Sequence, residues 1–119
     1  MKIAVTAKGK DLDSDVDPRF GRALYILIVD TDTLAVEAIE NSSNVNAFKG
    51  AGIQAATMIC DKEAEVLLTG HCGPNAFKTL EAAAIKVVND CTGKVRDAVT
   101  LLKEGKVTYA DGADVDGHW

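Results

Sequence analysis

Hydrophobic and polar positions change their spacing along the chain near residue 50. Before that point, short runs rich in β-branched residues predict strands at 3–7, 23–30 and 34–40. The run ALYILIVD is almost wholly apolar, as expected of a central strand covered on both faces. The short turn DTDT before the third strand predicts an antiparallel hairpin. In the third strand, the residues expected to share one face are Leu34, Val36 and Ala38.

Beyond residue 50, apolar residues recur with helical spacing, and two short buried strands at 65–70 and 85–90 separate the helices. Strand–helix–strand connections are parallel and right-handed. We therefore expect a mixed five-stranded α/β sheet, with strand order 3-2-1-4-5, flanked by helices. The residues expected on the apolar stripes are Ile53, Ala56, Thr57, Cys60 and Ala64, then Ala76, Phe77, Leu80 and Ala84, then Val95, Ala98, Val99 and Leu102 before Gly105.

Four loops of this predicted sheet open at its carboxyl edge, where open α/β sheets bind ligands. They are 8–22, 41–52, 70–75 and 90–93. With Lys94 included they carry six positive and five negative side chains, a net charge of +1. The rest of the chain carries seven against thirteen, a net charge of −6. An anion would therefore be steered to this edge.

Composition narrows the class of protein. A chain of 119 residues, 47% of them hydrophobic, can bury one core, and we expect one domain over 1–119 with a loosely ordered tail at 110–119. It has no long apolar run and no secretory signal, which predicts a soluble, cytoplasmic protein. The net charge of −5 disfavours nucleic acid or an anionic membrane as a partner. Three unevenly spaced cysteines fit a reducing compartment.

The loop KGKDLDSDVDPRFGR contains two kinds of candidate. Its aspartates imitate the start of an EF-hand, but Val16 and Arg22 stand where that motif needs glycine and glutamate. We interpret the aspartates as capping turns of their own loop. The following residues place two guanidinium groups and an aromatic ring around a glycine, and binding and structural roles both remain open for them: Arg19, Phe20, Gly21 and Arg22.

The stretch KGAGIQAA resembles a dinucleotide fingerprint in form only. About nine residues separate it from the preceding strand, whereas the fingerprint follows a strand directly. Free N–H groups at the start of a helix would still suit an anion. The candidates here are Lys49, Gly50 and Gly52.

The stretch TGHCGPNAF combines a helix start with two candidate metal ligands. Gly73 as N-cap and Pro74 as first helical residue explain GPNAF as a helix start. They leave His71 and Cys72 unexplained. A thiolate and an imidazole at the positive end of a helix could ligate a soft metal, and Cys91 could lie near Cys72. Cys60, in contrast, is expected in the core.

The sequence contains no GxSxG motif, no P-loop and no pair of carboxylates expected to face each other. Nothing in it assembles a general acid and a general base, which favours a binding protein over an enzyme. Two alternatives remain open. One is a thiol-redox or nucleotide-dependent enzyme, and the other is a metal-free protein-interaction module.

Three stretches together, LDSDVDPRFGRALYILIVD, GAGIQAA and GHCGPNAFKTLEAAAIKV, resemble the dinitrogenase iron–molybdenum cofactor biosynthesis family. That family includes the NifX-type accessory proteins, the carboxyl-terminal domain of NifB-type proteins and the small orange proteins of sulfate-reducing bacteria. The resemblance is greatest to the orange proteins. It runs from about residue 2 to about residue 110.

The resemblance implies a ribonuclease-H-like three-layer α/β fold and a small carrier that does not turn over a substrate. It implies as cargo an anionic metal–sulfur cluster, either a molybdenum–copper sulfide cluster or an iron–molybdenum cofactor precursor. Proteins that donate or accept clusters during assembly would be its partners, and the carrier itself would be a monomer or a weak dimer. The site residues that the resemblance implies are Arg19, Phe20, Gly21, Arg22, Gly50, Gly52, Gly70, Gly73, Pro74 and Asn75.

Overall fold

The structure, a computed structural model, describes residues 1–41 and 51–110, with Ala51 described by its backbone alone. All eight elements named here lie in that part of the chain. The strands are β1 (Lys2–Ala7), β2 (Tyr25–Asp30), β3 (Val36–Glu40), β4 (Val66–Leu68) and β5 (Lys86–Val88). The helices are α2 (Ala51–Asp61), α3 (Pro74–Ala82) and α4 (Val95–Lys103).

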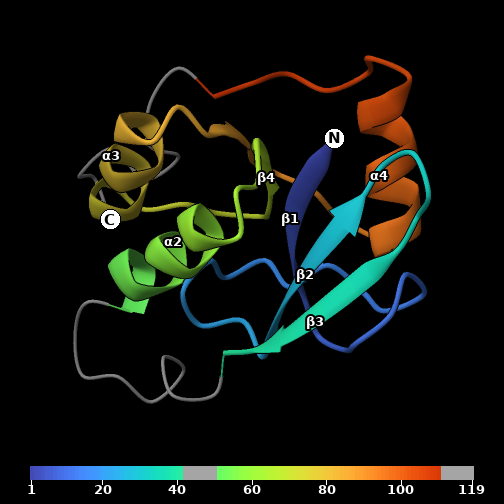
Figure 1. Cartoon of the computed structure of the whole chain (residues 1–119), viewed down its shortest axis with the longest axis horizontal. Coiled ribbons are helices and arrows are strands. Elements are labelled where there is room, and N and C mark those ends of the chain that lie inside the picture. Colours follow the sequence, from blue (N-terminus) through green and yellow to red (C-terminus); the bar gives the residue numbers. More distant parts are fainter. Residues whose placement is uncertain (42–50, 111–119) are drawn as a thin grey trace.

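The strands pair into one mixed sheet in the order β3-β2-β1-β4-β5 (Figure 1). The antiparallel pairs are β1 with β2 and β2 with β3, and the parallel pairs are β1 with β4 and β4 with β5. The predicted strand order and directions are therefore confirmed. The description of the fold as ribonuclease-H-like remains a prediction.

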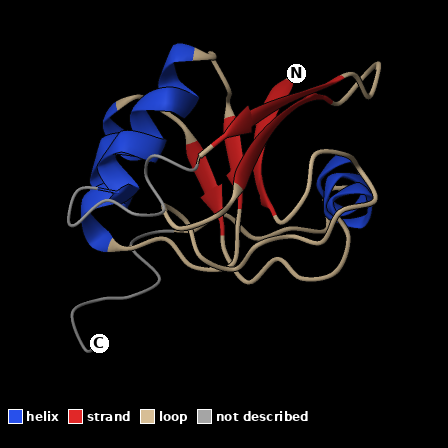
Figure 2. Ribbon diagram, turned by 90° about the horizontal axis from the view of Figure 1, so that it is seen from below, coloured by secondary structure: helices blue, strands red, loops and turns tan. Residues whose placement is uncertain are grey.

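Two hydrophobic cores lie on opposite faces of the sheet, because successive side chains of a strand point to opposite sides. On β1, Ala4 packs into the core beneath α2 and α3, whereas Ile3 and Val5 pack into the core beneath α4. Figure 2 shows the resulting three layers, with α4 alone on its side of the sheet. The stripe predicted for α4 is confirmed, and its buried residues are Val95, Ala98, Val99 and Leu102.

The β2–β3 hairpin differs from the prediction at its turn. Asp30 accepts hydrogen bonds from the backbone N–H groups of Asp32 (2.8 Å) and Thr33 (3.3 Å), and these bonds lower the pKa of Asp30. Leu34 has a φ of 62°, which is incompatible with a strand. The strand therefore begins at Val36. Val36 and Ala38 share one face of it as predicted, whereas Leu34 lies in the turn and does not belong to that face.

The face that α2 buries also differs from the prediction. Ile53 and Thr57 are exposed, and the buried residues are Ala55, Ala56 and Ile59. The reason lies in the contact between α2 and α3, where a Cβ on Gly52 would lie 3.1 Å from the Cβ of Ala76. Small residues on α2 let the two helices approach closely, and this turns Ile53 outward.

Two strands and one helix are shorter than predicted. The strands predicted at 65–70 and 85–90 keep only their central residues, in β4 and β5. The helix α3 ends at Ala82, so Ala84, with a φ of 60°, is an exposed loop residue rather than part of the stripe.

The described part of the chain ends against the sheet. The N–H group of Ala110 donates to the carbonyl of Val87 at 2.7 Å, so the predicted loose tail does not include Ala110. The rest of that tail, 111–119, lies outside the described residues. No helix in the described ranges is both long enough and apolar enough to span a bilayer.

Candidate functional site

Two segments that are far apart in the sequence, 18–20 and 70–71, bind each other at the carboxyl edge of the sheet, and we call them the loop unit. The N–H group of His71 donates to the carbonyl of Pro18 at 2.8 Å, and the N–H group of Phe20 donates to the carbonyl of His71 at 3.2 Å. This short parallel bridge joins Arg19 to His71. Gly70 lies beneath it, so close that a Cβ there would be 2.5 Å from the Cα of Pro18. Figure 2 shows the loops gathered along this edge of the sheet.

The turn that carries the two arginines is built around Gly21. Its φ of 90° is a conformation that side chains disfavour. The N–H group of Arg22 donates to the carbonyl of Arg19 at 3.1 Å and closes the turn. Gly21 is buried, Arg22 is partly buried, and the side chain of Arg19 is 64% exposed. The structure thus gives Gly21 a conformational role and leaves Arg19 accessible.

The first half of the same loop closes the N-terminus of α4. The carbonyls of Ser14 and Leu12 accept hydrogen bonds from the N–H groups of Val95 (2.9 Å) and Arg96 (2.8 Å). Asp11 accepts a hydrogen bond from the Asp13 N–H at 3.0 Å, as expected of an aspartate that caps its own turn. The start of α4 is therefore occupied by the protein's own carbonyls.

The starts of α2 and α3, in contrast, flank an open hollow of about 610 Å³. In the described part of the chain, nothing accepts a hydrogen bond from the N–H groups of Asn75 and Ala76 in the first turn of α3. A Cβ added at Gly73 would meet no described atom within 4 Å. The lining residues are Phe20, Gly52, Ile53, Gly73, Pro74, Asn75 and Ala76.

This arrangement suits an anion with an apolar surface. The N-terminus of each helix carries a partial positive charge, and the N–H groups of Asn75 and Ala76, which have no acceptor among the described residues, can donate to an anion. Phe20, Ile53 and Pro74 supply an apolar wall. Of the lining residues, Ile53 and Ala76 were not among the predicted site residues. Ile53 could have been found, because it follows the predicted Gly52 directly in the sequence.

The other predicted site residues that the structure describes do not line the hollow. Gly70 and Gly21 are buried, and neither His71 nor Cys72 lines the hollow. Lys49 and Gly50 lie outside the described residues.

Cys72 and Cys91 pack against different cores. Cys72 is fully buried in the core beneath α2 and α3, whereas Cys91 packs against the core beneath α4. Burial raises the pKa of Cys91 to about 11. Both thiols are free, and their packing against different cores does not favour a thiol pair. A ligand role for His71 or Cys72 remains a prediction, and the described residues contain no group of three His, Cys, Asp or Glu side chains that could hold a metal ion.

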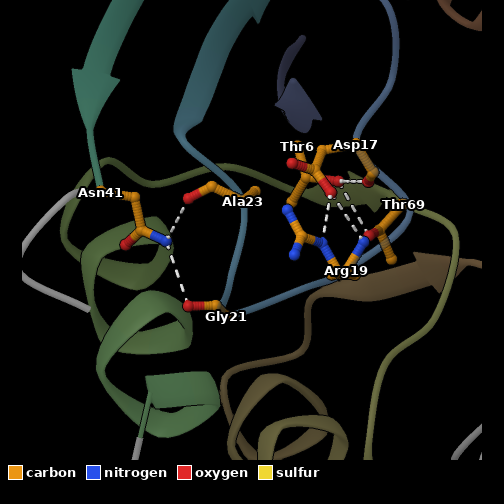
Figure 3. A network of polar contacts seen from close by, with 7 residues as sticks. All are labelled: Thr6, Asp17, Arg19, Gly21, Ala23, Asn41 and Thr69. Carbon is orange, nitrogen blue, oxygen red and sulfur yellow. Dashed lines mark hydrogen bonds and ion pairs between the residues drawn. The ribbon is translucent and has the colours of Figure 1, made fainter. Parts of the chain in front are cut away.

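A buried polar network anchors the loop unit to the sheet (Figure 3). The hydroxyl of Thr6 donates to the carbonyl of Asp17 at 2.7 Å and lies 2.8 Å from the hydroxyl of Thr69. On the other side, the side-chain amide of Asn41 donates to the carbonyls of Gly21 (3.2 Å) and Ala23 (2.8 Å). The segment between these two anchors is therefore held at both ends.

Comparison with known proteins identifies relatives over nearly the whole chain. The sequence profile of the family described as dinitrogenase iron-molybdenum cofactor matches residues 1–105. Among solved structures, the apo form of the orange protein from Desulfovibrio gigas is 47% identical and superposes with a TM-score of 0.92, over 95% of each chain. No curated protein sequence matches the chain significantly.

Two further structures extend the comparison. A protein from Thermotoga assigned to the NifB proteins is 34% identical, with a TM-score of 0.82 over 98% of each chain. A protein from Methanocaldococcus jannaschii assigned as a dinitrogenase is 18% identical, with a TM-score of 0.66 over 94% of this chain and 96% of its own. At that identity, the second likeness supports the fold alone.

Proposed function

The chain belongs to the dinitrogenase iron-molybdenum cofactor family, and on that premise we propose that it is a non-enzymatic, cytoplasmic carrier of an anionic metal–sulfur cluster. The observation that carries this proposal is the hollow between the starts of α2 and α3. It combines N–H donors that have no acceptor among the described residues, two positive helix ends and an apolar wall. These are the groups that a polysulfido anion requires, because its surface is negative and highly polarisable.

The cluster would be held through its sulfide surface rather than through bonds from protein to metal. The donors at the hollow are backbone N–H groups, those of Asn75 and Ala76, whereas Cys72 is fully buried and does not line the hollow. Arg19 extends from the adjoining loop with most of its side chain exposed, and adds positive charge. Binding of this kind preserves the cluster for transfer, since no coordination bond has to break.

The similarity to the orange protein supports a molybdenum–copper sulfide cluster as cargo, and membership of the family supports an iron–molybdenum cofactor precursor. Proteins that donate or accept such clusters are the proposed partners. The proposed carrier is a monomer or a weak dimer. A thiol-redox enzyme is less well supported, because Cys72 and Cys91 pack against different cores.

The proposal is tested by filling the hollow. Gly73→Leu places a side chain in open space at the start of α3, and Ala82→Leu adds an apolar side chain at the exposed end of the same helix. Anaerobic titration with tetrathiomolybdate and copper(I), followed by visible absorption and elemental analysis, measures cluster uptake. We expect Gly73→Leu to weaken uptake about tenfold or more, a loss of about 1.4 kcal/mol, and Ala82→Leu to leave it unchanged.

Equal uptake by the two variants would place the cluster elsewhere. A wild-type protein that takes up no cluster and copurifies with a stoichiometric partner would instead favour the metal-free interaction module.

A further inference from the structure

Asp17 is a buried carboxylate with only half of its hydrogen-bonding capacity used. Its side chain is 1% exposed. One oxygen, Oδ1, accepts a hydrogen bond from the backbone N–H of Arg19 at 3.0 Å and another from Nε of the same residue at 3.4 Å. The other oxygen, Oδ2, is buried and has no partner among the described residues.

A carboxylate in this environment lowers the stability of the folded state. Burying a charge and leaving one of its acceptors unsatisfied both oppose folding. Two threonine hydroxyls lie close by, yet neither serves the carboxylate, since Thr6 donates to the backbone carbonyl of Asp17 and Thr69 contacts Thr6 (Figure 3). An asparagine or a small apolar residue would avoid the buried charge. The charge itself therefore calls for a reason beyond folding.

Among the residues that the structure describes, the hydrogen bonds to this carboxylate come from Arg19 alone. Oδ1 of the carboxylate accepts from both the backbone N–H of Arg19 and the Nε edge of the guanidinium, so that edge of the group is tied to Asp17. The side chain is 64% exposed, and the other guanidinium nitrogens bond to no residue in the described ranges. Arg19 also forms the parallel bridge to His71, two residues before the Gly73 that lines the hollow.

We propose that Asp17 is a positioning residue for the anion site, which acts by holding the guanidinium of Arg19 in the orientation that receives the cluster. This inference rests on the proposed carrier function and deepens it, because it assigns a residue that contacts no cargo. Charge-assisted hydrogen bonds have the geometric specificity that such a role requires.

The sign of one effect separates this role from simple electrostatics. Asp17→Asn keeps the shape of the side chain and removes a negative charge beneath the site. A purely electrostatic role predicts tighter binding of an anion, because the local potential becomes more positive. A positioning role predicts weaker binding, because the neutral amide holds the guanidinium less firmly.

The chain offers a matched control in the same loop. Asp13 accepts a hydrogen bond from Nε of Arg96 at 3.1 Å, but its side chain is 64% exposed. Asp13→Asn therefore removes the same charge from a similar pair. A double-mutant cycle with Arg19→Gln then asks whether Asp17 acts through Arg19.

The experiment measures the affinity of each variant for tetrathiomolybdate with copper(I), alongside the thermal midpoint of unfolding. We expect Asp17→Asn to weaken binding about tenfold, Asp13→Asn to leave it unchanged, and Asp17→Asn to have no further effect in the Arg19→Gln background. A second measurement needs no ligand. In ¹⁵N NMR, the Nε–H proton of Arg19 should exchange with solvent slowly in the wild type and quickly in Asp17→Asn.

Binding by Asp17→Asn as tight as that of Asp13→Asn would overturn this inference alone. So would an equal loss of affinity with and without Arg19, since that would mark a structural role. A wild type that binds no probe would overturn the carrier proposal, and this inference with it.

Discussion

At the scale of single residues, Gly70 is constrained by the close approach of Pro18. A Cβ at Gly70 would lie 2.5 Å from the Cα and 2.7 Å from the carbonyl oxygen of Pro18, and neither backbone atom can move independently of the loop unit. The two hydrogen bonds that join Pro18 and Phe20 to His71 run directly beside this contact.

We therefore predict that Gly70→Ala lowers the free energy of unfolding by about 1–3 kcal/mol, as overpacking does in cores. Gly73→Ala is the control, because its Cβ meets no described atom and its φ of −72° suits alanine. Urea unfolding measures both variants. Equal stability of the two would mean that the Pro18 loop can shift away from Gly70.

The raised pKa of Cys91 predicts how the stability of the protein changes with pH. Burial raises the pKa of Cys91 from 9.0 to about 11, and the neighbouring charge of Asp90 adds to the effect. A raised pKa means that the folded state holds the thiol proton more tightly than the unfolded state. The stability contributed by this thiol is present below pH 9 and is lost as the pH rises towards 11.

The expected loss is at most about 2 kcal/mol, once the partial exposure of the thiol is allowed for. It is measured as the difference in unfolding free energy between wild type and Cys91→Ala from pH 8 to pH 11.5, at roughly half-unit steps. The difference should narrow across this range, because the variant lacks the titrating group. A difference that stays constant with pH would contradict the raised pKa.

The sequence revealed some residues of the site but not the orientation of their side chains. Gly73 and Pro74 could be assigned to a helix start, because capping preferences are local. Periodicity says nothing about a residue in a loop, so the burial of Cys72 could not be foreseen. The burial of Asp17 could not be predicted either, because this residue also lies in a loop and is buried by β1 and β4, which are distant from it in the sequence.

At the scale of elements, the three helices of the described residues differ in what meets their N-termini. The start of α4 is closed by carbonyls from the loop at 8–22, whereas α3 presents free N–H groups and α2 begins beside it. The helices themselves were predictable from apolar spacing. The buried face of α2 was not, because Gly52, which has no side chain, determines how closely α2 approaches α3.

At the scale of the whole molecule, the sheet order could be derived from rules of handedness and from hairpin length alone. Those rules also predicted that four loops meet at one edge. They could not predict which loops would bind each other, since the bridge from Arg19 to His71 depends on the fit of Gly70 against Pro18.

The two separate cores make the sheet a partition between the side of the proposed cluster site and a supporting side. Hydrogen exchange followed by mass spectrometry should reveal this division directly. Loading with tetrathiomolybdate and copper(I) should slow exchange in the first turns of α2 and α3, and leave α4 unchanged. Protection that spreads equally to α4 would show that the sheet transmits the binding event. A footprint confined to one face would mean that the supporting side can accumulate substitutions without altering what the protein carries.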